Sequence, residues 1–160
     1  MTLRRGEPLV LPGTVDRRLY RVDRGVLVSC REVEGAQQYM RFGYAGEYII
    51  SVDSYLTGQP TAYTLLALRK TEVAVASPEA YENWLRADQG RAAAWSAAKD
   101  WLILGMLARE VDLLTASPEE RYRRVLARSP RLFQEVPAKY IANYLRMTPE
   151  TLSRLKKDAG

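Results

Sequence analysis

The stretch VPAKYIANYLRMTPETLSR, residues 136–154, decides how the C-terminal part of this chain folds. Pro137 precedes a run that is compatible with helix, so a first helix is expected over residues 138–145. Thr148 is a good N-cap and is followed by proline, which suits the first position of a helix. A second helix should therefore start there and extend to about Lys157. The pattern predicts two short helices that cross over a tight turn.

The apolar residues of this stretch are spaced so that each helix buries one face. They are Ile141, Ala142, Leu145, Met147, Leu152 and Leu155. Ala142 is small, as it must be where the second helix crosses the first. The outward face of the second helix carries Pro149, Glu150, Ser153, Arg154 and Lys157. This is the arrangement of a helix-turn-helix, in which that face enters the major groove of DNA.

The outward side chains have the chemistry that base recognition needs. Arg154 can donate to the two acceptors of guanine, and Glu150 can accept from the amino group of cytosine. Because they are four residues apart, the two side chains can also brace each other. Hydroxyls and free backbone N–H groups at the helix start suit phosphate contacts, and nearby cations add attraction without sequence preference. The predicted DNA-binding set is Lys139, Thr148, Pro149, Glu150, Thr151, Ser153, Arg154, Lys156 and Lys157.

Charge is distributed unevenly along the chain. Residues 1–120 carry 14 Lys and Arg against 16 Asp and Glu, a net charge of −2. Residues 121–160 carry 10 against 3, a net charge of +7. A basic segment favours a polyanionic partner. A capped, basic surface hairpin without a ligand would explain the second helix alone, but the helix pair, the small Ala142 and the charge together favour DNA binding.

The first half of the sequence has the turn spacing of an all-β domain. Glycines interrupt it at mostly regular intervals, at Gly6, Gly13, Gly25, Gly35, Gly46 and Gly58. Strands are expected between them, at residues 19–22, 26–30, 38–42, 48–50, 63–68 and 73–76. Residues 23–25 and the pair Glu34-Gly35 are predicted hairpin turns. The residues alone predict a small sandwich or a rolled barrel.

Residues 89–114 read as one long helix without proline. Its apolar residues form two stripes, so both faces must be covered. The seven-residue step from Trp95 to Leu102 suits pairing with the same helix of a second copy. The predicted dimer interface is Trp95, Ala98, Trp101, Leu102 and Met106. The alternative is a helix at the centre of one globular core.

Two further helix starts are marked by a serine followed by a proline. Ser77 is expected to cap one helix and Ser117 another. At the second start, Ser117 forms a capping box with Glu120, and the helix should extend to about Arg128. The Ser-Pro pair at residues 129–130 should end that helix.

Composition excludes several kinds of site. With one cysteine, Cys30, and no histidine, the chain can build neither a disulfide framework nor a four-cysteine iron–sulfur cluster. It also lacks the commonest metal ligand and general base, so we expect no metal, no haem and no enzyme activity. No signal peptide and no membrane-spanning apolar run is evident, which favours a cytoplasmic location without a membrane partner.

Residues 136–154 resemble the helix-turn-helix of the Crp/Fnr regulators, most closely that of a short-tailed branch common in Bacteroidetes. Residues 119–122 match that branch too, and Gly6-Glu7, Pro12-Gly13, Leu19-Tyr20, Gly25 and Ala67-Leu68 follow the β-roll pattern of the family. The resemblance implies an α+β fold in three parts. Residues 1–77 form a cyclic-nucleotide-binding-like β-roll, which is a jelly-roll-like double-stranded β-helix. Residues 78–115 form a linker and dimerisation helix. Residues 116–160 form a helix-turn-helix DNA-binding domain.

The resemblance also implies a function. Members of this family are homodimers that bind near-palindromic operators in double-stranded DNA and regulate transcription by contacting RNA polymerase. By analogy, residues 148–157 form the recognition helix, and Glu150 and Arg154 read bases. The alternative is an effector-binding β-roll dimer that acts through protein partners and carries a vestigial DNA module.

The sequence departs from the family pattern at two functional places, and it begins without the family's usual N-terminal helix. Arg146 stands where such turns usually have glycine, which costs about 1 kcal/mol if the residue is left-handed. The implied effector pocket contains Gly46, Glu47, Thr61 and Ala62. Gly46 and Glu47 match the family, but its phosphate-binding arginine aligns with Thr61. We therefore expect neither cyclic AMP nor cyclic GMP to bind tightly.

Overall fold

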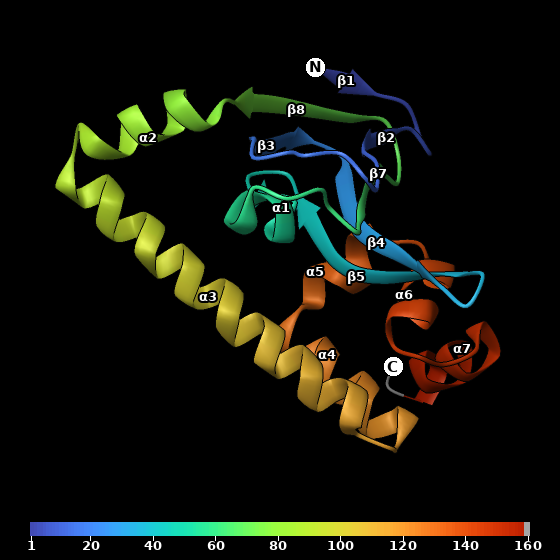
Figure 1. Cartoon of the computed structure of the whole chain (residues 1–160). Helices are drawn as coiled ribbons and strands as arrows, with labels where there is room; N and C mark the ends of the chain where they lie inside the picture. Colours follow the sequence, from blue (N-terminus) through green and yellow to red (C-terminus); the bar gives the residue numbers. More distant parts are fainter. Residues whose placement is uncertain (159–160) are drawn as a thin grey trace. The chain divides into compact units, whose positions relative to one another are not determined.

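The computed structural model describes residues 1–158 (Figure 1). The chain forms two compact units: unit 1, Met1–Trp84, and unit 2, which begins at Leu85. Unit 1 holds all the strands of the described chain, and unit 2 is helical, so the predicted α+β class is confirmed. The division into segments 1–77, 78–115 and 116–160 stays a prediction.

Unit 1 consists of two antiparallel sheets of four strands each. Their orders are β1-β8-β3-β6 and β2-β7-β4-β5. The strands are β1 (Thr2–Leu3), β2 (Pro8–Val10), β3 (Leu19–Arg24), β4 (Val26–Val33), β5 (Ala36–Tyr44), β6 (Tyr48–Ile49), β7 (Thr64–Ala67) and β8 (Thr71–Ala76). All six expected strands are present. The short strands β1 and β2 and the helix α1 (Val52–Thr57) were not expected, because two to six residues carry too little periodicity.

The core of unit 1 lies between the two sheets. One sheet contributes Leu3, Tyr20, Val22, Ile49 and Val73, and the other contributes Val10, Leu27, Leu65 and Ala67. Tyr20 and Val22 are buried whereas Arg21 between them is exposed, which is the alternation that a half-buried strand imposes. Burial of these side chains on the inner faces holds the sheets together.

The two predicted hairpin turns have different outcomes. Glu34 and Gly35 form a two-residue turn between β4 and β5, with φ of 52° and 74°. Residues 23–25, in contrast, form no hairpin, because β3 and β4 lie in different sheets. Gly25 has a φ of 96°, and a Cβ there would lie 2.5 Å from Thr71 Oγ1. Glycine is needed at this position because the chain changes sheets next to another backbone.

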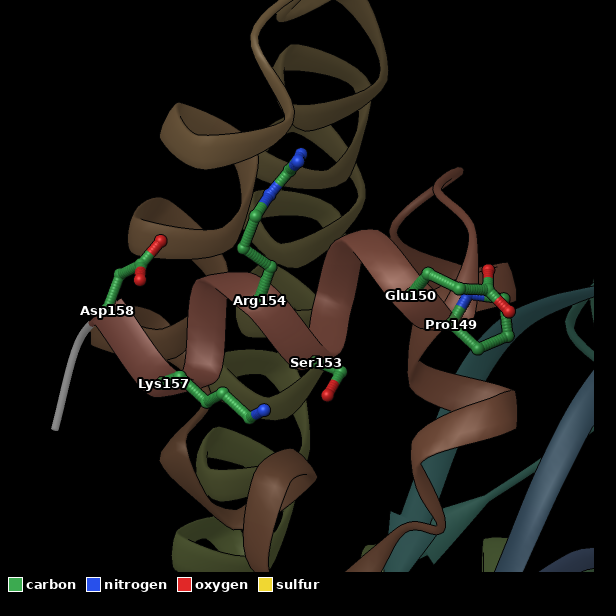
Figure 2. A pocket seen from close by; sticks show the side chains of 6 residues that line it. All are labelled: Pro149, Glu150, Ser153, Arg154, Lys157 and Asp158. Carbon is green, nitrogen blue, oxygen red and sulfur yellow. The ribbon is translucent and has the colours of Figure 1, made fainter.

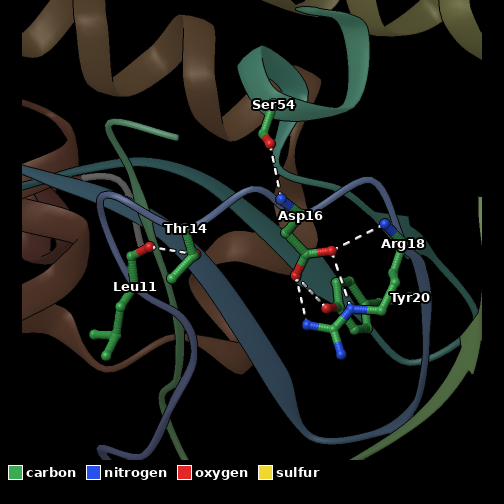
Figure 3. A network of polar contacts seen from close by, with 6 residues as sticks. All are labelled: Leu11, Thr14, Asp16, Arg18, Tyr20 and Ser54. Atoms are coloured by element: carbon green, nitrogen blue, oxygen red, sulfur yellow. Dashed lines mark hydrogen bonds and ion pairs between the residues drawn. The ribbon is translucent and has the colours of Figure 1, made fainter. Parts of the chain in front are cut away.

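A buried polar network connects the loop before β3 with the helix α1 (Figure 3). The backbone N–H of Asp16 donates to Ser54 Oγ at 2.8 Å. The Asp16 carboxylate accepts from Arg18 Nη2 at 2.8 Å and from the Tyr20 hydroxyl at 2.5 Å. Burial alone would raise the pKa of Asp16, but the hydrogen bonds from Arg18 and Tyr20 bring it below its ordinary value. The buried carboxylate is therefore ionised and fully engaged.

The helices of the chain follow the expected signals closely. They are α2 (Pro78–Arg86), α3 (Gln89–Leu114), α4 (Pro118–Arg128), α5 (Pro130–Glu135), α6 (Ala138–Tyr144) and α7 (Pro149–Asp158). Ser77 Oγ accepts from Ala80 N and Ser117 Oγ from Glu120 N, both at 3.2 Å, which confirms the two predicted caps. The short helix α5 was not expected, because a Ser-Pro pair that ends one helix also suits the start of the next.

The core of unit 2 comes mainly from the helices after α3. Its buried side chains include Tyr122, Val125, Leu132, Val136, Ile141, Leu145 and Leu152. Of the 26 residues of α3, only Asp112 is buried, and it forms ion pairs with Arg124 and Arg128 of α4 at 3.3 Å and 2.5 Å. The long helix is therefore anchored at its C-terminal end and is not the centre of a globular core in this chain.

Candidate nucleic-acid interface

Helices α6 and α7 are joined by a tight turn whose backbone caps α6. The N–H of Met147 donates to the carbonyl of Ala142, and the N–H of Arg146 donates to that of Asn143, both at 3.0 Å. This pair of hydrogen bonds is a Schellman motif, which needs a left-handed residue after the C-cap. Arg146 takes that position with a φ of 53°. The sequence left open whether this residue is left-handed; the structure shows that it is, at a cost of about 1 kcal/mol without glycine.

The predicted packing of the two helices is present. Ile141, Leu145 and Leu152 are fully buried. Ala142 is 1% exposed, which confirms that the crossing leaves no space for a larger side chain. Met147 and Leu155 are partly buried. Burial of this face leaves the opposite face of α7 free to contact another molecule.

The N-terminus of α7 carries two threonine hydroxyls. Thr148 Oγ1 accepts from the N–H of Thr151 at 3.2 Å, which confirms Thr148 as the N-cap. The two hydroxyl oxygens lie 3.1 Å apart. Next to them, hydrogen bonds from its own backbone N–H and from the Thr148 hydroxyl hold the pKa of Glu150 below its ordinary value. At neutral pH the α7 face thus presents a carboxylate acceptor beside hydroxyl donors.

The outward face of α7 is a shallow, open hollow (Figure 2). Its lining residues are Pro149, Glu150, Ser153, Arg154, Lys157 and Asp158. Five of these are the residues expected on the outward face, and Asp158 is an addition. Figure 2 shows Arg154 extended away from Glu150. The bracing that their spacing allows is not seen there, and the guanidinium and the carboxylate are separately available.

Three further members of the predicted DNA-binding set do not line this hollow. Thr151 is partly buried at the start of α7. Lys156 is exposed, with its ammonium 5.8 Å from the centre of the Phe133 ring. Lys139 is exposed on α6, 4.7 Å from the centre of the Tyr140 ring. The aromatic faces steer both ammonium groups without removing them from solvent.

The predicted dimer residues lie on a helix with much exposed apolar surface. Trp101 is 75% exposed and Met106 is 47% exposed. Ala98 is also exposed, whereas Trp95 and Leu102 are partly buried. Large apolar side chains that were not in the predicted set are exposed too, namely Ile103, Leu104, Leu107, Val111, Leu113 and Leu114. An apolar surface of this extent is typical of an interface with another molecule.

The four implied effector residues take part in contacts within unit 1. The backbone of Gly46 and Glu47 pairs with Val22, with Gly46 N donating to Val22 O at 2.8 Å. Thr61 Oγ1 donates to the Asp53 carboxylate at 2.7 Å, and the backbone N–H of Ala62 donates to it at 2.8 Å. An internal carboxylate thus occupies the donors of Thr61 and Ala62. Sequence reasoning missed Asp53, because no local pattern links it to a loop eight residues later.

The side chain of Cys30 is unsuited to ligation or redox chemistry. It is fully buried, and burial raises the pKa of its thiol to about 11. Within residues 1–158, no group of three Cys, His, Asp or Glu side chains could hold a metal ion. The same residues include no helix that is long and apolar enough to cross a membrane.

Comparison with solved structures identifies the fold. Over 99% of this chain, the structure superposes on 82% of FixK2 from Bradyrhizobium japonicum with a TM-score of 0.81 and 19% identity. A CRP-family transcriptional regulator from Thermus thermophilus superposes with a TM-score of 0.73 and 21% identity, over 99% of this chain and 83% of its own. A CooA mutant from Carboxydothermus hydrogenoformans superposes with a TM-score of 0.78 and 16% identity, over 99% of this chain and 74% of its own.

At these low identities, the superpositions establish similarity of fold. No family model and no characterised protein matches the sequence itself. The resemblance to the Crp/Fnr regulators, with a β-roll followed by a long helix and a helix-turn-helix, is confirmed for the fold.

Proposed function

We propose that this chain, whose fold is that of the Crp/Fnr regulators, is a sequence-specific DNA-binding transcription regulator that acts as a homodimer. The observation that carries the proposal is the outward face of α7, where a guanidinium, an ionised carboxylate and a lysine stand clear of a buried helix crossing. A helix of this kind fits the major groove, and α7 is anchored by its buried crossing with α6.

Each polar group of the α7 face has a role in this proposal. Arg154 donates to guanine and Glu150 accepts from cytosine, which gives base preference. Thr148 and Thr151 contact phosphate at the helix start, where backbone N–H groups also favour an anion. Lys139, Lys156 and Lys157 add phosphate attraction, and Ser153 and Pro149 complete the contact surface.

The second copy needed for a palindromic operator is supplied through α3. A single recognition helix contacts too few base pairs for a tight complex, whereas two related by a twofold axis read half-sites about 34 Å apart. The exposed Trp101 and Met106 provide apolar surface that the second copy would cover. We place the dimer interface on Trp95, Ala98, Trp101, Leu102 and Met106.

Control by a cyclic nucleotide is not part of the proposal. The Asp53 carboxylate already accepts from Thr61 and Ala62, and it would repel a phosphate at the same donors. We expect a regulator without a resident cofactor that acts in the cytoplasm and contacts RNA polymerase at its operator.

Selection of bound sequences from random duplex DNA tests the proposal. Repeated rounds with the full chain should enrich one near-palindromic motif, and binding to that motif should weaken steeply as salt is raised. Enrichment of no motif would contradict sequence-specific recognition and would favour a dimer that acts through protein partners.

A further inference from the structure

Arg121, in α4, is a buried cation whose partners are all backbone carbonyls. The residue is 8% exposed. Its Nε donates to Leu145 O at 2.8 Å, and its Nη2 donates to Arg146 O at 3.1 Å. Its Nη1 donates to Ala116 O at 3.2 Å and also to Thr115 O. Among the described residues, no carboxylate pairs with this guanidinium, so carbonyl dipoles alone compensate a buried charge.

The four carbonyls lie at the C-terminal ends of two different helices. Thr115 is the C-cap of α3, and Ala116 follows it. Leu145 is the C-cap of α6, and Arg146 follows it. The last carbonyls of a helix lack partners inside the helix and form the negative end of its dipole. One guanidinium thus receives two negative helix ends and ties them together.

The geometry of this contact requires an arginine. A guanidinium presents its N–H groups in a planar fork, so it can point in two directions at once. Here Nε and Nη2 point to the end of α6, and Nη1 points to the end of α3. A lysine has its donors on one nitrogen and could hold one helix end but not span both.

The contact also supports the left-handed turn. Arg146 holds a backbone conformation that side chains rarely adopt, and its carbonyl is bound by Arg121. A second arginine reinforces the same place from α3, since Arg109 Nη2 donates to Tyr144 O and its guanidinium carbon lies 3.8 Å from the centre of the Tyr144 ring. Arginines from α3 and α4 thus hold three successive carbonyls at the end of α6, residues 144–146.

We infer that Arg121 is the positioning residue that fixes the orientation of α7 relative to the end of α3. The inference rests on the proposed function, because it is as a DNA reader that α7 needs a fixed orientation relative to the dimer helix. The carbonyls that Arg121 binds belong to residues 115, 116, 145 and 146, outside the α7 face. Its effect on binding is therefore indirect, through the α6–α7 turn of residues 145–148.

The test measures geometry separately from binding. For the distance measurement, spin labels are attached to cysteines at the exposed positions Lys99 of α3 and Lys157 of α7. Labelled protein is diluted with unlabelled protein, so that only distances within one chain are measured. Operator affinity is measured on the same variants without these cysteines, because Lys157 belongs to the proposed DNA-binding set. The buried thiol of Cys30 does not compete for label. We compare wild type, Arg121→Met, Arg121→Lys and the control Arg123→Met, in which an exposed arginine of the same helix loses its ion pairs with Glu119 and Glu120.

We expect one narrow distance distribution for wild type and for Arg123→Met. Arg121→Met and Arg121→Lys should give broader or displaced distributions at unchanged helix content, together with a loss of about tenfold in operator affinity. The lysine variant keeps the charge, so it separates positioning from charge and remains informative if the methionine variant does not fold.

An unchanged narrow distribution in Arg121→Lys would overturn the inference. So would recovery of full operator affinity in that variant, because a lysine cannot bridge both helix ends. Failure of wild type to select any DNA would contradict the proposed function, and the distance measurement would still decide the role of Arg121.

Discussion

Unit 1 closes its apolar residues into one core between two sheets, whereas the longest helix of unit 2 buries only Asp112 among its 26 residues. The polar groups differ in the same way. In unit 1 the carboxylates of Asp16 and Asp53 are engaged by internal donors. In unit 2 the charged groups of the α7 face point to solvent.

This difference separates the part of the molecule that is complete as one chain from the part that needs other molecules. Unit 1 has its own core and internally paired anions. Unit 2 has an uncovered apolar helix and an uncovered polar face, which correspond to the two partners that we propose, a second copy and DNA. Variants in each unit should therefore affect different properties.

The largest effect is expected from Leu102→Asp in α3. A carboxylate in the proposed dimer interface should give monomers or aggregates, and operator affinity should fall by roughly a hundredfold or more because half-sites are then bound singly. Sedimentation equilibrium and DNA titration measure both effects. The control Leu56→Asp places the same charge on an exposed leucine of unit 1 and should leave the dimer intact. A wild-type monomer at micromolar concentration would refute the interface.

A smaller effect is expected from Asp16→Asn in unit 1. Loss of the charged acceptor for Arg18 and Tyr20 should lower the free energy of unfolding by about 2 kcal/mol. The exposed pair of Asp23 with Arg21 provides the control, since Asp23→Asn should cost less than about 1 kcal/mol. Urea unfolding monitored in each unit measures the change, and equal losses in the two variants would disprove the role of burial.

The Asp16 network also predicts a dependence on pH. The pKa of Asp16 is lowered in the folded protein, so its stabilisation is complete above the ordinary value of 3.8 and is lost as the pH falls through the folded value. In wild type the unfolding midpoint of unit 1 should therefore fall on acidification. The midpoint of Asp16→Asn should fall less steeply with pH. An equal dependence of the midpoint on pH in the two proteins would contradict the prediction.

Within residues 1–158, two residues other than glycine are left-handed, and they allow a matched comparison between the units. Glu34 lies in the β4–β5 hairpin of unit 1 and Arg146 in the α6–α7 turn of unit 2. Glycine at either position removes backbone strain, which stabilises the folded state. The greater conformational freedom of glycine in the unfolded chain offsets part of this gain. Each variant should stabilise its own unit by up to about 1 kcal/mol in thermal unfolding. Destabilisation of unit 2 by Arg146→Gly would mean that the arginine side chain contributes more than its backbone strain costs.

The smallest effect is expected from cyclic nucleotides. Titration calorimetry of wild type with cyclic AMP and cyclic GMP should show no saturable binding at micromolar concentration. Asp53→Ala frees the donors of Thr61 and Ala62 but supplies no cation, so affinity should stay weak there too. Micromolar or tighter binding by wild type would show that another residue replaces the missing arginine.

The sequence predicted best those features that depend on residues close together in the chain. The caps at Ser77, Ser117 and Thr148 follow from the nearest few residues. The bounds of α3 also follow from a long uninterrupted pattern.

Features that depend on contacts between distant segments could not be predicted in this way. Gly25 looked like a hairpin residue, and its actual role depends on Thr71, 46 positions later. The contact of Arg121 with Leu145 spans 24 positions, and the contact of Asp53 with Ala62 joins a helix to a loop. No local spacing specifies such partners, because tertiary packing brings them together.

Base preference at single positions tests the central claim most directly. The motif selected by wild type is compared with those selected by Arg154→Ala, on the α7 face, and Lys156→Ala, beside it. We predict that Arg154→Ala loses preference at one base pair of each half-site, with a cost of about 1–3 kcal/mol on the wild-type operator. Lys156→Ala should weaken binding to all DNA sequences alike and leave the selected motif unchanged. An unchanged motif and affinity in Arg154→Ala would contradict the proposal that α7 reads DNA.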